Sequence, residues 1–296
     1  MNDDNKIRVG VAYGIGAYLL WGLLPIYWKL LYQVPALEIL ANRFIWSAVF
    51  VGFLLWATGG FSFFYKEAKE IFSSFSTGFR LVLAAITVSF NWGIYIWAVS
   101  AGRIVETSMG YYINPLVSIL FGVIFLKERL NRMQIIAVMW AALGIAVIVV
   151  KNGSLPWVSV SLAVTFALYG LLKKIIVASS LTTIMLETLI MSPIALFYIY
   201  SMGSSSAYYA GSTSTICMLL GAGIATATPL LLFTSCAKMI PLTMVGFLQY
   251  MSPTITLLLG VFVYGEAFTV THMLAFGCIW IGLLCFTWSQ IRKKKE

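Results

Sequence analysis

The reactive side chains of this sequence form no familiar catalytic or metal-binding pattern. His272 is the single histidine, and the four cysteines stand in apolar stretches without the spacing of metal ligands. The sequence therefore contains no serine–histidine–aspartate triad and no zinc motif, and a GxxxxGK[ST] phosphate loop is also missing. We expect no catalytic residue, no metal site and no cofactor, and we expect that the chain is not an enzyme.

Arg43 is the residue whose type and position stand out most. It lies inside a long apolar stretch, where a charge costs at least a few kcal/mol unless it is paired or hydrated. Glu38 is five positions earlier, roughly 140° away around a helix, so the two side chains are not expected to pair within one helix. Arg43 needs either a bound anion or a structural partner on another helix, and its type and position leave both alternatives open.

Asn91, Trp92 and Tyr95 place an amide and two aromatic rings in the middle of another apolar stretch. Rings supply stacking area for a flat organic ligand, and an amide fixes its orientation. The alternative is that these aromatic residues belong to the belts at the membrane interfaces, where tryptophan and tyrosine are common.

The elements that position these residues follow from composition. The chain is 61% apolar and 10% charged, with a mean hydropathy of +0.94, whereas soluble domains are about 45–50% apolar and about 25% charged. Continuous apolar runs of helical-span length predict an all-α polytopic membrane protein rather than a barrel. Ten transmembrane helices are expected, at 9–31, 35–57, 79–101, 104–126, 133–150, 156–175, 181–202, 214–236, 242–264 and 271–289.

The basic residues predict the orientation of these spans. Of the 19 lysines and arginines, 15 fall on the side of the two termini and 3 on the other, while Arg43 lies within a span. Because cytoplasmic loops carry the basic excess, we expect both termini in the cytoplasm and the protein in the cytoplasmic membrane. Residues 290–296 form a basic cytoplasmic tail on this interpretation, and residues 61–76 form an amphipathic helix at the membrane surface.

An internal repeat divides the chain. A shift of 138 residues aligns 112–128 with 250–266 at six identical positions, and it also pairs Ala137 with Ala275 and Gly144 with Gly282. A shift of 148 pairs 21–24 with 169–172. The halves, 9–150 and 156–289, would each hold five spans, and an odd number forces the second half to be inverted. Inverted repeats are typical of secondary transporters, with a site between the halves near the bilayer midplane.

The repeat also predicts where that site lies. Pro115 and Pro253 occupy matched positions at the centres of two spans, and interrupted helices at matched positions point to a transport site. A tolerated packing kink is the alternative. The polar and aromatic neighbours that would line the same cavity are Tyr111, Tyr112, Asn114, Gln249, Tyr250 and Ser252.

The remaining acidic residues have two interpretations. Glu38 and Glu187 are repeat mates near the starts of two spans, so each could carry a coupling proton, although acidic residues also favour helix N-termini for electrostatic reasons. Glu106 is expected to pair with Arg103, and Glu266 is expected to be structural.

Five stretches of the sequence resemble the drug/metabolite transporter superfamily with its duplicated EamA halves, and in particular its RarD branch. They are AYLLWGLLPIYWKLL (17–31), EILANRFIWS (38–47), NWGIYIWAVSAGRIVETSMGYYINPL (91–116), ALYGLLKK (167–174) and GFLQYMSPT (246–254). The resemblance covers nearly the whole chain and implies a membrane permease that exports small organic solutes. It implies no particular substrate, and we transfer no binding residue from it.

We therefore expect a secondary transporter of amino acids, metabolites or drugs that works by alternating access. The alternatives are a membrane accessory or sensor protein without transport activity and a membrane-embedded lipid-modifying enzyme. The expected partners are a small-molecule substrate and the lipid bilayer, with no nucleic acid. The sequence leaves both a monomer and a homodimer open.

Overall fold

The computed structural model describes residues 3–126, 132–153, 155–240 and 248–293, and every regular element in these ranges is helical. The long helices are α1 (Asp3–Leu30), α2 (Ala36–Ala57), α4 (Phe75–Ser100), α5 (Ile104–Leu126), α6 (Arg132–Asn152), α7 (Trp157–Ile175), α8 (Ser180–Met202), α10 (Thr213–Met239) and α13 (Val270–Lys293). The shorter ones are α3 (Phe61–Ser73), η1 (Gly203–Ser205), α9 (Ala207–Ala210), α12 (Met251–Leu258) and the π-helical η2 (Leu259–Val263).

The helices have the composition of membrane spans. Five helical stretches in the described part of the chain are both long and apolar enough to cross a membrane: Ile7–Leu30, Ala36–Ala57, Phe75–Ser100, Ser180–Ser205 and Thr213–Phe233. The chain is thus an all-α, multi-pass membrane protein, because helices satisfy their backbone hydrogen bonds internally in lipid.

The two closely spaced spans on either side of Arg103 are separate helices, as expected. α4 ends at Ser100 and α5 begins at Ile104, and between them Gly102 adopts a φ of 71°, which favours glycine. The other close pair of spans meets near Pro241, which lies outside the described residues. The predicted amphipathic segment 61–76 contains α3, which buries Phe64 and Ile71 and leaves most of its other side chains exposed.

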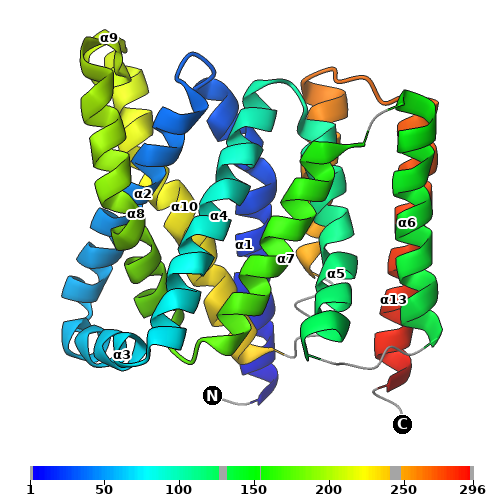
Figure 1. Cartoon of the computed structure of the whole chain (residues 1–296), viewed down its shortest axis with the longest axis horizontal. Helices are drawn as coiled ribbons and strands as arrows, with labels where there is room; N and C mark the ends of the chain where they lie inside the picture. The colour runs from blue at the N-terminus through cyan, green and yellow to red at the C-terminus, as the bar shows by residue number, and fades with distance from the viewer. Residues whose placement is uncertain (1–2, 127–131, 154, 241–247, 294–296) are drawn as a thin grey trace.

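Successive long helices alternate in direction, and α1 begins at the same end of the bundle where α13 ends (Figure 1). This end is called the terminal end below, and the opposite end is called the far end. α6 packs against α13 along one edge of the bundle, and α2 packs against α8 on the other side (Figure 1). The helices between them pack as α1 with α10, α4 with α7 and α5 with α7. The helices α1, α4, α5, α7 and α10 form the middle of the bundle and are called the central helices below (Figure 1).

The two repeat-related prolines lie in different surroundings. Residues 248–249 are helical, Tyr250 is a turn, and α12 begins at Met251, so Pro253 lies in the first turn of a new helix. Proline is tolerated there because its missing N–H would have no partner in that turn, and its ring disfavours a continuous helix through the preceding residues. α5 runs without a break from Ile104 to Leu126 across Pro115. In the described part of the chain, the expected interruption is thus present in the second half, and α5 does not show it.

Candidate functional site

A cavity of about 430 Å³ lies among the central helices. Side chains from α1, α2, α4, α5, α7, α8, α10 and α12 line it, so both sequence halves contribute to its walls. The candidates from the sequence that line this cavity are Arg43, Trp92, Tyr95, Tyr111, Gln249, Ser252 and Pro253. Its volume suits a small organic molecule.

Arg43 of α2 carries a buried charge into the cavity wall. Its side chain is 4% exposed, and its guanidinium carbon lies 4.3 Å from the ring centroid of Trp92 and 4.8 Å from that of Trp28. Its Nε donates a hydrogen bond of 3.0 Å to Oγ1 of Thr226 on α10. Trp92 is held in turn by stacking on Phe44, at 5.7 Å between centroids. Arg43 thus links α2, α4 and α10 and has no carboxylate partner among the described residues.

Aromatic rings form another part of the cavity wall. Tyr111 of α5 packs edge-on against Tyr95 of α4 at 5.8 Å and against Phe166 of α7 at 5.9 Å. Phe166 continues to Tyr169 at 6.0 Å, which extends this wall along α7. Such rings offer apolar stacking area to a flat solute.

A second cation in the wall, Lys173 of α7, is already neutralised. Its Nζ lies 2.9 Å from Oε1 of Glu187 and also donates to Oγ1 of Thr183. Tyr169 donates a hydrogen bond of 3.0 Å to the other carboxylate oxygen of Glu187. Each oxygen of the Glu187 carboxylate therefore has a partner that lines the cavity.

The cavity extends toward the terminal end of the bundle. Lys173 lies near the end of α7, Ala178 lies in the connection from α7 to α8, and Ser180 begins α8, and all three residues line the cavity. This connection lies at the terminal end (Figure 1). The cavity therefore reaches from the centre of the bundle to one end of it.

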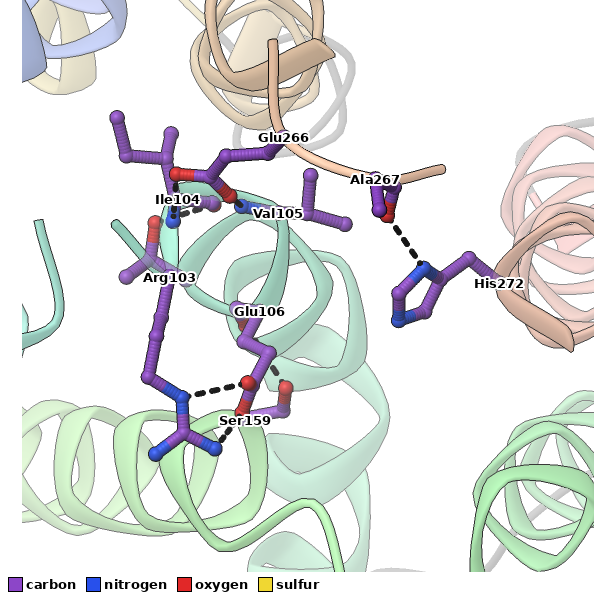
Figure 2. Close-up of polar contacts among 9 residues, drawn as sticks. Arg103, Ile104, Val105, Glu106, Ser159, Glu266, Ala267 and His272 are labelled. Carbon is purple, nitrogen blue, oxygen red and sulfur yellow. Dashed lines mark hydrogen bonds and ion pairs between the residues drawn. The ribbon is translucent and has the colours of Figure 1, made fainter. Parts of the chain in front are cut away.

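Polar contacts join the two sequence halves at the far end. The carboxylate of Glu266, which follows η2, accepts hydrogen bonds from the backbone N–H groups of Ile104 (2.8 Å) and Val105 (2.9 Å) (Figure 2). These N–H groups begin α5 and have no acceptor within the helix, so the carboxylate caps α5 and also complements its dipole. Ser108 of α5 adds a 2.7 Å bond to the carbonyl oxygen of Pro253. Glu266 is thus structural, as expected.

Arg103 pairs with Glu106 at the same end, which confirms the expectation from the sequence. The two side chains form two hydrogen bonds, from Nε to Oε1 at 2.6 Å and from Nη2 to Oε2 at 3.0 Å (Figure 2). Ser159 of α7 donates to the backbone oxygen of Glu106, and Nδ1 of His272 lies 3.1 Å from the carbonyl oxygen of Ala267 (Figure 2).

Asn91 and Asn114, whose amides were predicted to line the cavity, do not line it and instead bond to the helix α7. Asn91 is fully buried and donates from Nδ2 to the Leu162 carbonyl oxygen (3.0 Å) and to Oγ1 of Thr165 (2.8 Å). Its Oδ1 accepts a 3.3 Å bond from the hydroxyl of Tyr111, and so it holds that ring in the wall. Asn114 donates to the carbonyl oxygen of Ala163. Both amides therefore fix α7 beside α4 and α5.

Three further candidates, Tyr112, Tyr250 and Glu38, do not line the cavity. Tyr112 and Tyr250, which are repeat mates, stack on each other at 6.3 Å with an interplanar angle of 14°. Glu38 is fully buried, and its Oε1 accepts hydrogen bonds from the side chain of Ser206 and the backbone N–H of Ala207. Pro115 belongs to α5, and its side chain lies outside the described residues.

Several residues that line the cavity or contact Arg43 were not selected from the sequence. Trp28 and Thr226 contact Arg43 from other helices, and a single sequence does not indicate such long-range contacts. A signal was present for Trp21 and Tyr169, because the shift of 148 residues pairs them and both line the cavity. From the sequence, Lys173 was interpreted as a charge on the cytoplasmic side, with a side chain that reaches into an inner vestibule as the alternative.

Fold and cavity together define a multi-pass helical membrane protein with a solute-sized cavity. The model of the EamA-like transporter family matches residues 8–150 and 156–288, so the chain belongs to that family, and the family's description points to a transporter rather than an enzyme. It is similar to the uncharacterized transporter YojE of Bacillus subtilis (strain 168), with 47% identity over 98% of this chain and 97% of the relative.

RarD proteins are similar over the same length. Protein RarD of Salmonella typhi is 40% identical over 99% of both chains, which makes this chain a RarD-type member of the EamA family and of the drug/metabolite transporter superfamily. A solved structure titled "Crystal structure of protein" is 17% identical, covers 94% of this chain and 97% of its own, and superposes with a TM-score of 0.60. That likeness concerns the fold alone.

Proposed function

We propose that this membrane transporter exports small organic solutes, such as amino acids, metabolites or drugs, across the cytoplasmic membrane. It would work by alternating access between two inverted five-helix repeats, 9–150 and 156–289, with both termini in the cytoplasm. Neither the lipid-modifying enzyme nor the accessory protein gains support from a specific feature of the described residues.

Reciprocal contacts between repeat mates support the inverted halves. A Cβ added at Gly144 of α6 would lie 2.8 Å from the carbonyl oxygen of Ala275, and a Cβ added at Gly282 of α13 would lie 2.8 Å from that of Ala137. Exchanging the two sequence halves turns one contact into the other. Both contacts together require that α6 and α13 run antiparallel, as Figure 1 shows. A two-fold pseudo-axis perpendicular to the helices produces this pattern, and an axis parallel to them does not.

The helix packing follows the same exchange. If the spans pair in order, α1 corresponds to α7, α4 to α10 and α5 to the segment that contains α12. The packing of α1 on α10 then becomes that of α7 on α4, and the packing of α5 on α7 becomes that of α12 on α1. All four contacts are present, which supports halves that can rock against each other.

The observation that carries the proposal is a cavity that extends to one end of the bundle, while the two halves are joined at the other end. It reaches the terminal end past Lys173 and Ser180, while Glu266 joins the halves at the far end. A solute would enter from the terminal end, and release at the far end would require Glu266 to part from α5. With the basic terminal end in the cytoplasm, this arrangement loads from inside the cell.

Glu187 is the better candidate for a coupling carboxylate. Its partners Lys173 and Tyr169 line the cavity, so a proton or a solute that enters can reach this group. Glu38, in contrast, binds a buried serine and a backbone N–H near the far end.

The test is flux through the purified protein in liposomes, screened with labelled amino acids and drugs, with and without a pH gradient. A matched pair of variants tests the route. Gly170 lines the cavity, and a Cβ there meets nothing within 4 Å, so Gly170→Trp should fill the cavity without disturbing the helix. Gly277 of α13 has equally open space but does not line the cavity, so Gly277→Trp is the control.

We expect flux in the original protein and in Gly277→Trp and at least a tenfold loss in Gly170→Trp. Full flux in Gly170→Trp would contradict this route, and no flux of any screened solute together with stable binding of a partner protein would contradict transport itself.

A further inference from the structure

Two arginines of this protein lie between pairs of tryptophans, and only one of them has a carboxylate. Arg103 lies 5.6 Å from the ring centroids of both Trp97 and Trp157, and its two bonds to Glu106 are 2.6 and 3.0 Å long. Arg43 lies closer to its tryptophans, at 4.3 and 4.8 Å, but its one hydrogen-bond acceptor in the described chain is the neutral hydroxyl of Thr226.

Arg43 is also the more deeply buried of the two. Its side chain is 4% exposed, and its Nη1 is buried without any hydrogen-bond partner among the described residues. The guanidinium is always charged in proteins and presents five N–H donors in a planar fork. Aromatic faces attract the cation, but they cannot accept these hydrogen bonds in the plane of the fork, and a buried charge without an anion is costly.

We propose that the missing anion is the solute, and that this cavity binds an organic monoanion whose oxyanion group, such as a carboxylate, pairs with Arg43. This inference rests on the transport function proposed above and names its substrate class. The fork matches the two oxygens of a carboxylate, so the pair would resemble the one that Arg103 forms with Glu106.

The charges around the cavity favour one negative charge. Lys173 and Glu187 cancel each other, and Arg43 is the one unpaired charge among the described residues that line the cavity. The Glu187 carboxylate is taken up by Lys173 and Tyr169, so the ammonium group of an amino acid or a cationic drug would find no free carboxylate there. A simple anion therefore suits the cavity better than a zwitterion or a cation.

The wall next to Arg43 favours a flat apolar body on that anion. Trp92, Tyr95 and Tyr111 surround the guanidinium side of the cavity, and Phe166 and Tyr169 continue the aromatic wall toward the terminal end. An inorganic anion would leave this aromatic area unused, so the organic body contributes to binding.

The test is isothermal titration calorimetry on the purified protein in detergent. The probes share one body and differ in charge: indole-3-propionate, its neutral amide, the zwitterion tryptophan and the cation tryptamine. Benzoate with benzamide is a smaller pair, and inorganic phosphate is an anion without an apolar body. We expect an acid to bind at least tenfold more tightly than its amide and than the other probes. Equal affinity of acid and amide, tighter binding of phosphate, or no binding of either acid would overturn the proposal.

Variants locate the anion. Arg43→Gln should abolish the preference for the acid over the amide, whereas Arg103→Gln should retain it within about twofold, because Arg103 does not line the cavity. Thr226→Asp keeps Arg43 and supplies it with an internal carboxylate. This variant should therefore lose the preference for the acid over the amide although its buried arginine is paired. A preserved preference in Thr226→Asp, or in a folded Arg43→Gln, contradicts the proposal.

The two proposals fail in different ways. Acids that bind through Arg43 without any flux in liposomes would leave the anion site standing and remove the transport function. Flux of neutral solutes that Arg43→Gln does not affect would leave transport standing and remove the anion site.

Discussion

The far end of the bundle and the central cavity use their charged groups differently. At the far end, Arg103 is paired with Glu106 and Glu266 is bonded to the first N–H groups of α5. In the cavity, Lys173 has the same kind of internal partner, but Arg43 has two tryptophans and one hydroxyl. Arg103, Glu106 and Glu266 at the far end therefore find partners within the chain, whereas Arg43 leaves one charge in the cavity without an anionic partner among the described residues.

This difference separates the charged groups that stabilise the fold from the one that we propose binds the solute. A buried guanidinium is a poor choice for stability alone, since an apolar side chain of similar size would often do as well. The same aromatic arrangement with a carboxylate at Arg103 indicates that the chain can supply a partner where one is needed. The absence of a carboxylate around Arg43 among the described residues supports the proposal that an anion binds in the cavity.

The largest effect on stability is expected when the second cavity cation is removed. Lys173→Met leaves the buried carboxylate of Glu187 without its ion-pair partner, which should lower the free energy of unfolding by about 3 kcal/mol. Unfolding in mixed micelles of increasing SDS content measures this change. The double variant with Glu187→Gln should recover most of the loss. A double variant as unstable as Lys173→Met would show that the loss does not come from the unpaired Glu187 carboxylate.

A change at the far end should alter which side opens. Glu266→Gln removes the charge and one acceptor oxygen from the cap of α5, a loss of about 1.5–3 kcal/mol. We expect the far end to open roughly tenfold to a hundredfold more often, since 1.4 kcal/mol is a factor of ten. Labelling of Ser108→Cys by an impermeant maleimide, in a protein without the four native cysteines, reports this opening.

Glu106→Gln is the matched control for that experiment. It breaks the pair with Arg103, but both residues belong to the first half of the chain, so the contact between halves stays intact. Equal labelling of the two variants would contradict the role of Glu266 in closing the far end.

Substitutions in the contact between α6 and α13 should lower stability without changing how often the far end opens. Gly144→Ala and Gly282→Ala each place a Cβ 2.8 Å from a backbone oxygen, so each should cost about 1–3 kcal/mol by overpacking. The proposed pseudo-symmetry predicts equal losses in thermal stability and unchanged maleimide labelling. A large loss in one variant and none in the other would speak against the symmetric contact.

The smallest effect is expected at the partnered arginine. The side chain of Arg103 is 33% exposed, so Arg103→Gln should change the free energy of unfolding by about 1 kcal/mol or less. The same SDS titration measures it. A loss as large as that of Lys173→Met would show that the far end depends on this pair far more than its exposure implies.

The sequence predicts the helices well because apolar runs and flanking charges are local signals. The expected spans 35–57 and 104–126 correspond to α2 (Ala36–Ala57) and α5 (Ile104–Leu126) with little change. The repeat also paired Gly144 with Gly282 and Ala137 with Ala275, and the structure brings these positions into contact. Gly144 lies beside Ala275 and Gly282 lies beside Ala137, so each glycine meets the alanine of the other pair.

The details of the site were less accessible to sequence reasoning. Arg43 stands out from its type and depth alone, but nothing local indicates that Trp28 lies on one of its faces or that Thr226 accepts its hydrogen bond. Asn91 and Trp92 are neighbours, and only the rotation of α4 decides that Trp92 lines the cavity while Asn91 bonds to α7. Such choices depend on packing between helices, which periodicity does not specify.

The most direct test of the account compares flux of an organic acid with flux of its amide in liposomes that contain the original protein, Arg43→Gln or Arg103→Gln. Loss of a charge-assisted pair of about 1.5–3 kcal/mol corresponds to roughly a tenfold to hundredfold loss of acid transport. The account predicts this loss in Arg43→Gln alone, with Arg103→Gln close to the original protein. Equal acid flux in all three proteins would contradict it.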